Sequence, residues 1–99
     1  MKPKDKKIRF GKLVHLGCIV CKELGFGWTP PEIHHLKGYQ FSSMGKRAQD
    51  EYTIPLCYYP HRTGGGGEVG YHQSPAEFER RYGTQAELLE LVDELIYKN

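Results

Sequence analysis

Cysteine and histidine are the residues of this 99-residue chain whose types and spacing could do chemistry. Cys18 and Cys21, in the sequence GCIVC, have the spacing that lets two thiolates bind one tetrahedral metal ion. Cys57 offers a third thiolate, and His61 can supply the fourth ligand, with His15 as the other candidate. The pattern predicts a structural zinc site of the Cys3His type. Buried cysteines without a metal, or a redox couple of Cys18 and Cys21, are the alternatives.

Two adjacent histidines, His34 and His35, stand in the segment EIHHLKG. Because neighbouring side chains of a strand point to opposite faces, the two imidazoles can serve different purposes. One can bind a metal ion while the other stays free and neutral, as the base that activates water in phosphodiester hydrolysis. The alternative is that the pair stabilises a hydrogen-bond network or joins the zinc ligands.

The length and composition of the chain predict a single small domain. A chain of 99 residues with 38% hydrophobic residues and 12 glycines buries a small core, so a metal ion would be a useful supplement to its stability. Three cysteines are an odd number, and no apolar signal segment opens the chain, which favours a reduced, cytoplasmic setting. No stretch approaches membrane-spanning length, so no membrane partner is expected.

Basic charge is concentrated in the part of the chain that holds the cysteines. Residues 1–62 carry 11 Lys and Arg against 5 Asp and Glu, whereas the remainder carries 3 against 7. We therefore expect a polyanion such as DNA to meet the first part. Arg62, next to His61, is the expected contact to a scissile phosphate. The other candidate phosphate contacts are Lys2, Lys4, Lys6, Lys7, Arg9, Lys12, Lys37, Lys46 and Arg47.

The elements that must position these residues can be read in outline. We expect a basic, solvated arm over residues 1–12 and a domain over residues 13–99, with a short helix over about 8–16. Residues 32–36 and 52–57 have the content of two short strands that pair as a hairpin.

The end of the chain predicts two helices. Ser74, Pro75 and Glu77 are typical of a helix start, and Gly83 should end that helix after about residue 82. Thr84 repeats the capping pattern for a final helix. Its apolar face, expected to pack in the core, consists of Leu88, Leu91, Val92, Leu95 and Ile96.

Taken together, these motifs resemble the HNH (ββα-metal) endonucleases and, more closely, the phage Ref (recombination enhancement function) nucleases. The segments LGCIVC, IHHLKG, IPLC and FERRYGTQAELL occur in that order over residues 13–95. The resemblance implies an α+β fold, namely a small zinc-stabilised ββα-metal domain with C-terminal helices. It also implies a metal-dependent DNA endonuclease that acts with a recombinase–DNA filament. A zinc-stabilised DNA-binding or protein-binding module without catalysis is the alternative.

The resemblance also implies roles for individual residues. His34 matches the family's metal-binding histidine, His35 its general base, and His72 a second ligand of the catalytic Mg2+, Mn2+ or Zn2+. Cys18, Cys21 and Cys57 match the structural zinc cysteines, while His61 could serve either metal. The middle residue of the HNH motif is usually an asparagine, near the position of Tyr52 here. The base must then be oriented by another group, Asp50 or a backbone carbonyl.

Overall fold

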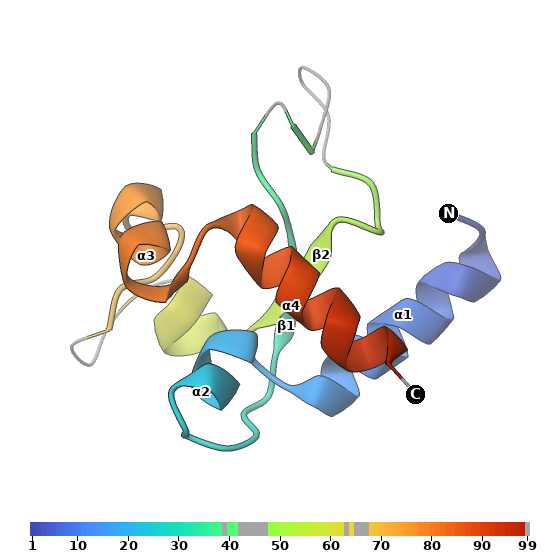
Figure 1. Ribbon diagram of the computed structural model, residues 1–99, viewed down its shortest axis with the longest axis horizontal. Helices are drawn as coiled ribbons and strands as arrows, with labels where there is room; N and C mark the ends of the chain where they lie inside the picture. The colour runs from blue at the N-terminus through green and yellow to red at the C-terminus, as the bar shows by residue number, and fades with distance from the viewer. Residues whose placement is uncertain (39, 42–47, 63, 65–67, 99) are drawn as a thin grey trace.

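The computed structural model describes residues 1–38, 40–41, 48–62, 64 and 68–98 (Figure 1). Lys46 and Arg47, two of the expected DNA contacts, lie outside the described residues. The elements in chain order are α1 (Pro3–Leu16), α2 (Ile19–Glu23), β1 (Glu32–His35), β2 (Thr53–Leu56), the irregular turn η1 (Tyr58–Arg62), α3 (Pro75–Tyr82) and α4 (Gln85–Tyr97). Within the described part of the chain, no helix is long and apolar enough to span a membrane.

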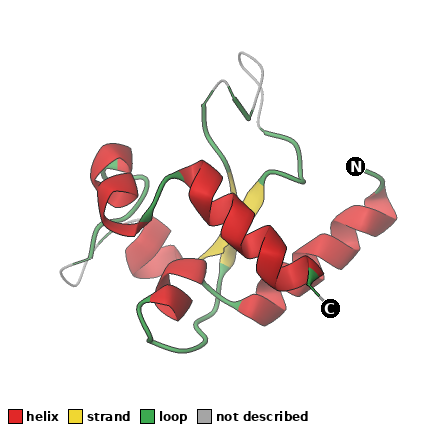
Figure 2. Ribbon diagram, in the orientation of Figure 1, coloured by secondary structure: helices red, strands yellow, loops and turns green. Residues whose placement is uncertain are grey.

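An antiparallel pair of strands lies among the helices (Figure 2). β1 pairs with β2 so that His34 is opposite Ile54 and His35 is opposite Thr53, which confirms the expected hairpin. Pro55 cannot donate to a ladder, and a strand with one neighbour has an open edge that tolerates it. The protein is therefore an α+β domain, as the sequence predicts, with the two adjacent histidines at the end of its first strand.

The hydrophobic core surrounds β2, all four residues of which are buried. α1, α2 and α4 contact this strand, and α4 crosses in front of the sheet in Figure 1. The side chains that fill this space come from every part of the chain, among them Leu13, Ile19, Val20, Leu36, Ile54, Leu56, Phe78, Leu88 and Val92. Because β2 is buried along its whole length, it holds in place the backbone of Cys57, which directly follows it.

The N-terminal segment differs from the expected arm. α1 begins at Pro3, so the predicted boundary after residue 12 falls inside a continuous helix. Arg9 is 2% exposed, and its guanidinium donates to the Thr53 Oγ1 at 3.0 Å, the Thr53 carbonyl at 2.7 Å and Asp93 Oδ1 at 2.8 Å. The expectation that Arg9 contacts DNA is therefore corrected, since this side chain joins α1, β2 and α4 inside the domain.

The two C-terminal helices form where the capping residues predict them. Ser74 accepts a hydrogen bond from the Glu77 N–H, and the backbone N–H of Gly83 donates to the Glu79 carbonyl to end α3. Thr84 and Glu87 form a reciprocal capping box at the start of α4. On the apolar face of α4, Leu88 and Val92 are buried, as expected, but Leu95 remains exposed.

Candidate metal centre and histidine pair

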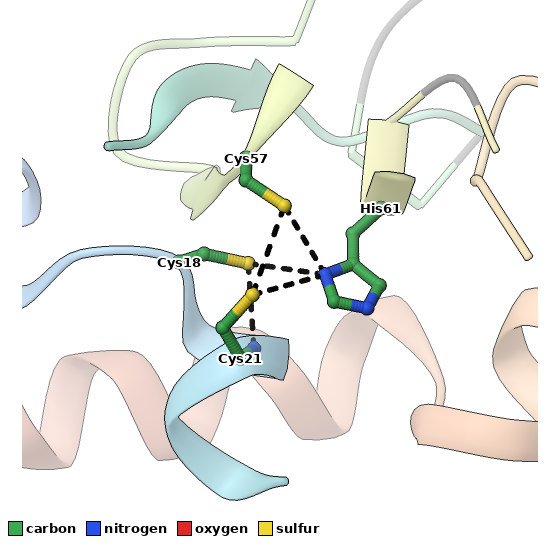
Figure 3. A group of neighbouring side chains, drawn as sticks. All are labelled: Cys18, Cys21, Cys57 and His61. Atoms are coloured by element: carbon green, nitrogen blue, oxygen red, sulfur yellow. Dashed lines mark hydrogen bonds between the residues drawn. The ribbon is translucent and has the colours of Figure 1, made fainter. Parts of the chain in front are cut away.

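Three cysteines and a histidine converge on one point in the interior. The ligand atoms of Cys18, Cys21, Cys57 and His61 all lie within 4.8 Å of one another, and all four residues are buried (Figure 3). His61 Nδ1 lies 3.6, 3.3 and 3.2 Å from the sulfurs of Cys18, Cys21 and Cys57, and the sulfurs of Cys21 and Cys57 are 3.8 Å apart. The predicted Cys3His group is thus present, with His61 and not the exposed His15 as its fourth member.

These distances fit a tetrahedral ion. Zinc bonds of about 2.3 Å to sulfur and about 2.0 Å to nitrogen separate the ligand atoms of a tetrahedron by about 3.5 to 3.8 Å. The distances of 3.2 to 3.8 Å within the cluster are close to these values. The buried Cys3His group could therefore hold a structural metal ion such as zinc.

Short local structures position the ligands. Cys18 is the N-cap of α2, and its sulfur accepts a hydrogen bond from the Cys21 N–H at 3.4 Å, the compact turn that brings two thiols together. Cys57 directly follows the buried strand β2. η1 then turns back, with the Arg62 N–H donating to the Cys57 carbonyl at 3.0 Å, so that His61 faces the three sulfurs.

A carboxylate and a phenol orient the imidazole of His61. Glu68 Oε1 lies 3.0 Å from His61 Nε2 and accepts a hydrogen bond of 2.9 Å from the Tyr82 hydroxyl. The hydrogen bond to His61, and then that from Tyr82, lower the pKa of Glu68. An ionised Glu68 requires the proton on Nε2, which leaves Nδ1 free to face the sulfurs.

The protonation of the thiols bears on the alternatives to a metal site. Burial raises the pKa of Cys18 and raises the pKa of Cys57 to about 12. Thiols in such surroundings are inert unless a metal ion stabilises the thiolates. This argues against the redox alternative, because a reactive Cys18–Cys21 couple needs a lowered thiol pKa.

His34 and His72 form a second group. Their ring centroids are 5.9 Å apart, and His34 also contacts Tyr71 at 4.9 Å between centroids. His34 is 1% exposed, and among the described residues neither of its ring nitrogens has a hydrogen-bond partner. Gln85 is near enough to oppose the lowering of the His34 pKa, but its amide makes its two hydrogen bonds, each of 2.8 Å, with the backbone of Lys37. An unpartnered buried imidazole beside an exposed one suits a pair of metal ligands.

The electrostatics keep both imidazoles neutral. Burial and then the positive charge of Arg62 lower the pKa of His34 to about 4. The same two causes lower the pKa of His72. Arg62 Nη2 donates to His72 Nε2 at 3.2 Å, and its Nη1 forms an ion pair with Glu32. Neutral imidazoles can donate a lone pair to a cation at physiological pH, and His72 would do so by exchanging Arg62 for the cation.

His35 has different neighbours. Its Nε2 lies 2.9 Å from Asp50 Oδ1, and its ring contacts Phe10 at 6.3 Å between centroids. Lys6 lies 3.6 Å from the second oxygen of Asp50. The structure thus brings His34 and His72 together and places His35 with Asp50, one of the two groups suggested as its orienting partner.

Backbone pairing connects the two groups of histidines. The Tyr71 N–H donates to the His61 carbonyl at 2.9 Å, and the His72 N–H donates to the Arg62 carbonyl at 2.8 Å. The turn η1, which supplies His61 to the Cys3His cluster, therefore also fixes the backbone of His72.

Several contributing residues could not be anticipated. Glu32, Glu68 and Gln85 each contact a site residue or its neighbour through the tertiary fold, and no motif marks them. Of the expected phosphate contacts within the described residues, those exposed at the surface are Lys2, Lys4, Lys7, Lys12 and Lys37, while Lys6 is half-buried and pairs with Asp50.

Comparison with known proteins identifies the family of the chain. A model of the family described as "recombination enhancement, RecA-dependent nuclease" matches residues 4–97. The chain belongs to this family of recombination-enhancement nucleases. It is also 30% identical over 86 residues, or 87% of its length, to the uncharacterised protein YdfU of Escherichia coli strain K12. The chain spans 21% of the length of that relative.

Proposed function

We propose that this chain is a metal-dependent DNA endonuclease of the HNH type that acts on DNA held in a recombinase filament. The observation that carries the proposal is the orphaned imidazole of His34 beside His72, in a chain that belongs to a nuclease family. The order β1, β2, α3, with His34 on the first strand and His72 just before the helix, supports a ββα-metal arrangement.

In this proposal, His34 and His72 hold a divalent cation such as Mg2+, Mn2+ or Zn2+. When bound, the cation would stabilise the charge that develops on the phosphate. His35 accepts the proton of the attacking water at a ring nitrogen, while the carboxylate of Asp50 fixes the ring and the charge that forms. Arg62, which is held by Glu32, neutralises the scissile phosphate.

The remaining groups have supporting roles. Zinc at the Cys3His cluster fixes η1 and, through the backbone pairs to residues 71 and 72, the position of His72. The exposed lysines outside the α1–α4 groove, Lys2, Lys4 and Lys37, add affinity for DNA phosphates without sequence specificity. These contacts do not recognise the base sequence, as expected for a nuclease whose DNA substrate is selected by the recombinase filament.

A cleavage assay tests the proposal. Wild type, His34→Ala, His72→Ala and His35→Ala are incubated with plasmid and single-stranded DNA, free and in RecA filaments, with Mg2+, Mn2+ or Zn2+. Each histidine variant should lose at least about 100-fold in cleavage rate. Glu90→Ala removes an exposed side chain of α4, away from both histidines, and should cut as wild type does. DNA binding by wild type without cleavage, in filaments and with every metal, would instead establish a binding module.

A further inference from the structure

An apolar groove runs between α1 and the end of α4, away from both groups of histidines. Its volume is about 540 Å³, and its floor is aliphatic, with Ile8 and Leu16 from α1 and Leu95 and Ile96 from α4. Ile8 is 48% exposed and Leu95 39% exposed. Contiguous exposed apolar side chains of this kind mark interaction surfaces.

The rim of the groove is basic. Lys7 and Lys12 line it, and a neighbouring hollow of about 510 Å³, which shares Leu16 with the groove, is lined by Lys22 and the exposed Trp28. Among the described residues that line the two hollows, none carries a carboxylate. An occupant that matches both features is apolar on the side that enters the groove and acidic along its edges.

We propose that this groove docks an acidic, amphipathic segment of a protein partner. The inference rests on the proposed function, under which the partner is the recombinase of the filament. The aliphatic floor of the groove can accept the apolar face of a peptide helix. Among the described residues that line the groove itself there is no Phe, Tyr or Trp on which a base could stack, and Trp28 lies in the neighbouring hollow.

The position of the groove suits simultaneous binding of partner and DNA. His72 lies three residues before the start of α3, and Figure 1 shows α3 and the C-terminal end of α4 on opposite sides of the molecule. A partner seated on Leu95 and Ile96 therefore leaves the His34–His72 pair open to DNA.

Binding measurements with groove variants test this inference. Ile8→Glu and Leu95→Glu place a carboxylate where the apolar face of the segment would lie. The full-length variants are tested by fluorescence anisotropy against purified RecA filaments on labelled single-stranded DNA, and against the same DNA without RecA. We expect at least about tenfold weaker binding to the filament and unchanged binding to free DNA. Val14→Glu is the matched control, because Val14 is on the same helix and 48% exposed but does not line the groove.

The outcomes separate this inference from the nuclease proposal. Filament binding by the groove variants at wild-type strength would overturn it, as would wild type that does not bind filaments. An equal loss on free DNA would show that the groove is a DNA surface, which also overturns it. His34→Ala should bind filaments normally, so failure of the nuclease proposal appears only in cleavage. Thermal unfolding curves and the measured zinc content of each variant verify that it is folded. If a glutamate variant unfolds, Ile8→Ser or Leu95→Ser replaces it.

Discussion

At the scale of single residues, Arg9 shows that a basic side chain near the start of the chain can be structural. Its guanidinium satisfies a buried carbonyl and hydroxyl of Thr53 and pairs with the partly exposed Asp93. Arg9→Met keeps the aliphatic stem but leaves the Thr53 carbonyl without its partner, so we expect a loss of about 2–3 kcal/mol in the free energy of unfolding. Urea unfolding of the metal-loaded protein measures this. Lys7→Met, on the exposed side of the same helix, should change stability by less than about 0.5 kcal/mol, and similar losses in both variants would contradict this interpretation.

Asp50 offers a second prediction at this scale. We expect it to act as a positioning residue, because its carboxylate lies 2.9 Å from His35 Nε2. Asp50→Ala should lower kcat for DNA cleavage by about 10- to 100-fold and leave KM and DNA affinity unchanged. Asp5→Ala, an exposed acid in the first turn of α1, is the control. A change in KM with normal kcat would show that Asp50 acts on DNA binding instead.

At the scale of elements, two glycines of the N-terminal segment should respond in opposite directions to the same substitution. Gly17 ends α1 with φ of 81°, and a Cβ there would lie 2.6 Å from Cδ1 of Trp28. Gly11 lies within the helix, with nothing within 4 Å of an added Cβ. Gly17→Ala should therefore destabilise the protein by about 1–2 kcal/mol, and Gly11→Ala should stabilise it by about 0.5–1 kcal/mol. Thermal unfolding of both variants checks the opposite signs, and a stabilised Gly17→Ala would disprove the steric argument.

An element could be predicted from the sequence when the residues that determine it lie within or next to it. The hairpin and the two C-terminal helices depend on composition and on caps such as Thr84, which act within a few residues. α2 was missed because its five residues are too few for a helical period to be seen. α1 begins at Pro3, and a proline in the first turn followed by Asp5 is a local start signal that the expected arm overlooked. The packing of Arg9 on β2 and α4 is a tertiary cause that the local sequence does not contain.

At the scale of the whole molecule, one part of the candidate site was predictable from local sequence, and another depends on tertiary contacts. The Cys3His cluster was predictable because zinc requires ligand types and a short Cys-x2-Cys turn that sequence spacing reveals. Contacts such as Arg9 with Asp93, which are 84 positions apart, exist only after the helices have packed. The orphaned state of the His34 imidazole is also a tertiary property, because it depends on what the neighbouring side chains bind instead.

Loss of the metal ion proposed for the Cys3His cluster should therefore affect the entire domain. The cluster joins the start of α2, the end of β2 and η1, and without a cation it leaves three thiols and an imidazole buried together. Structural zinc contributes about 10–16 kcal/mol in small modules, comparable with the roughly 5–15 kcal/mol stability of a whole domain. We expect chelation at neutral pH to unfold most of the chain, as measured by far-UV circular dichroism, and readdition of Zn2+ to restore it.

Two variants separate the structural metal from the proposed catalytic one. Cys57→Ser should abolish tight binding of one zinc per chain in native mass spectrometry, together with the cooperative thermal transition. His34→Ala should retain both, because His34 is outside the Cys3His cluster, while losing cleavage. Since residues 71 and 72 pair with residues 61 and 62, partial loss of zinc should reduce cleavage in proportion to the unfolded fraction. A chelated protein that keeps its native spectrum would show that the cysteines form an ordinary core and that His72 is held by other contacts.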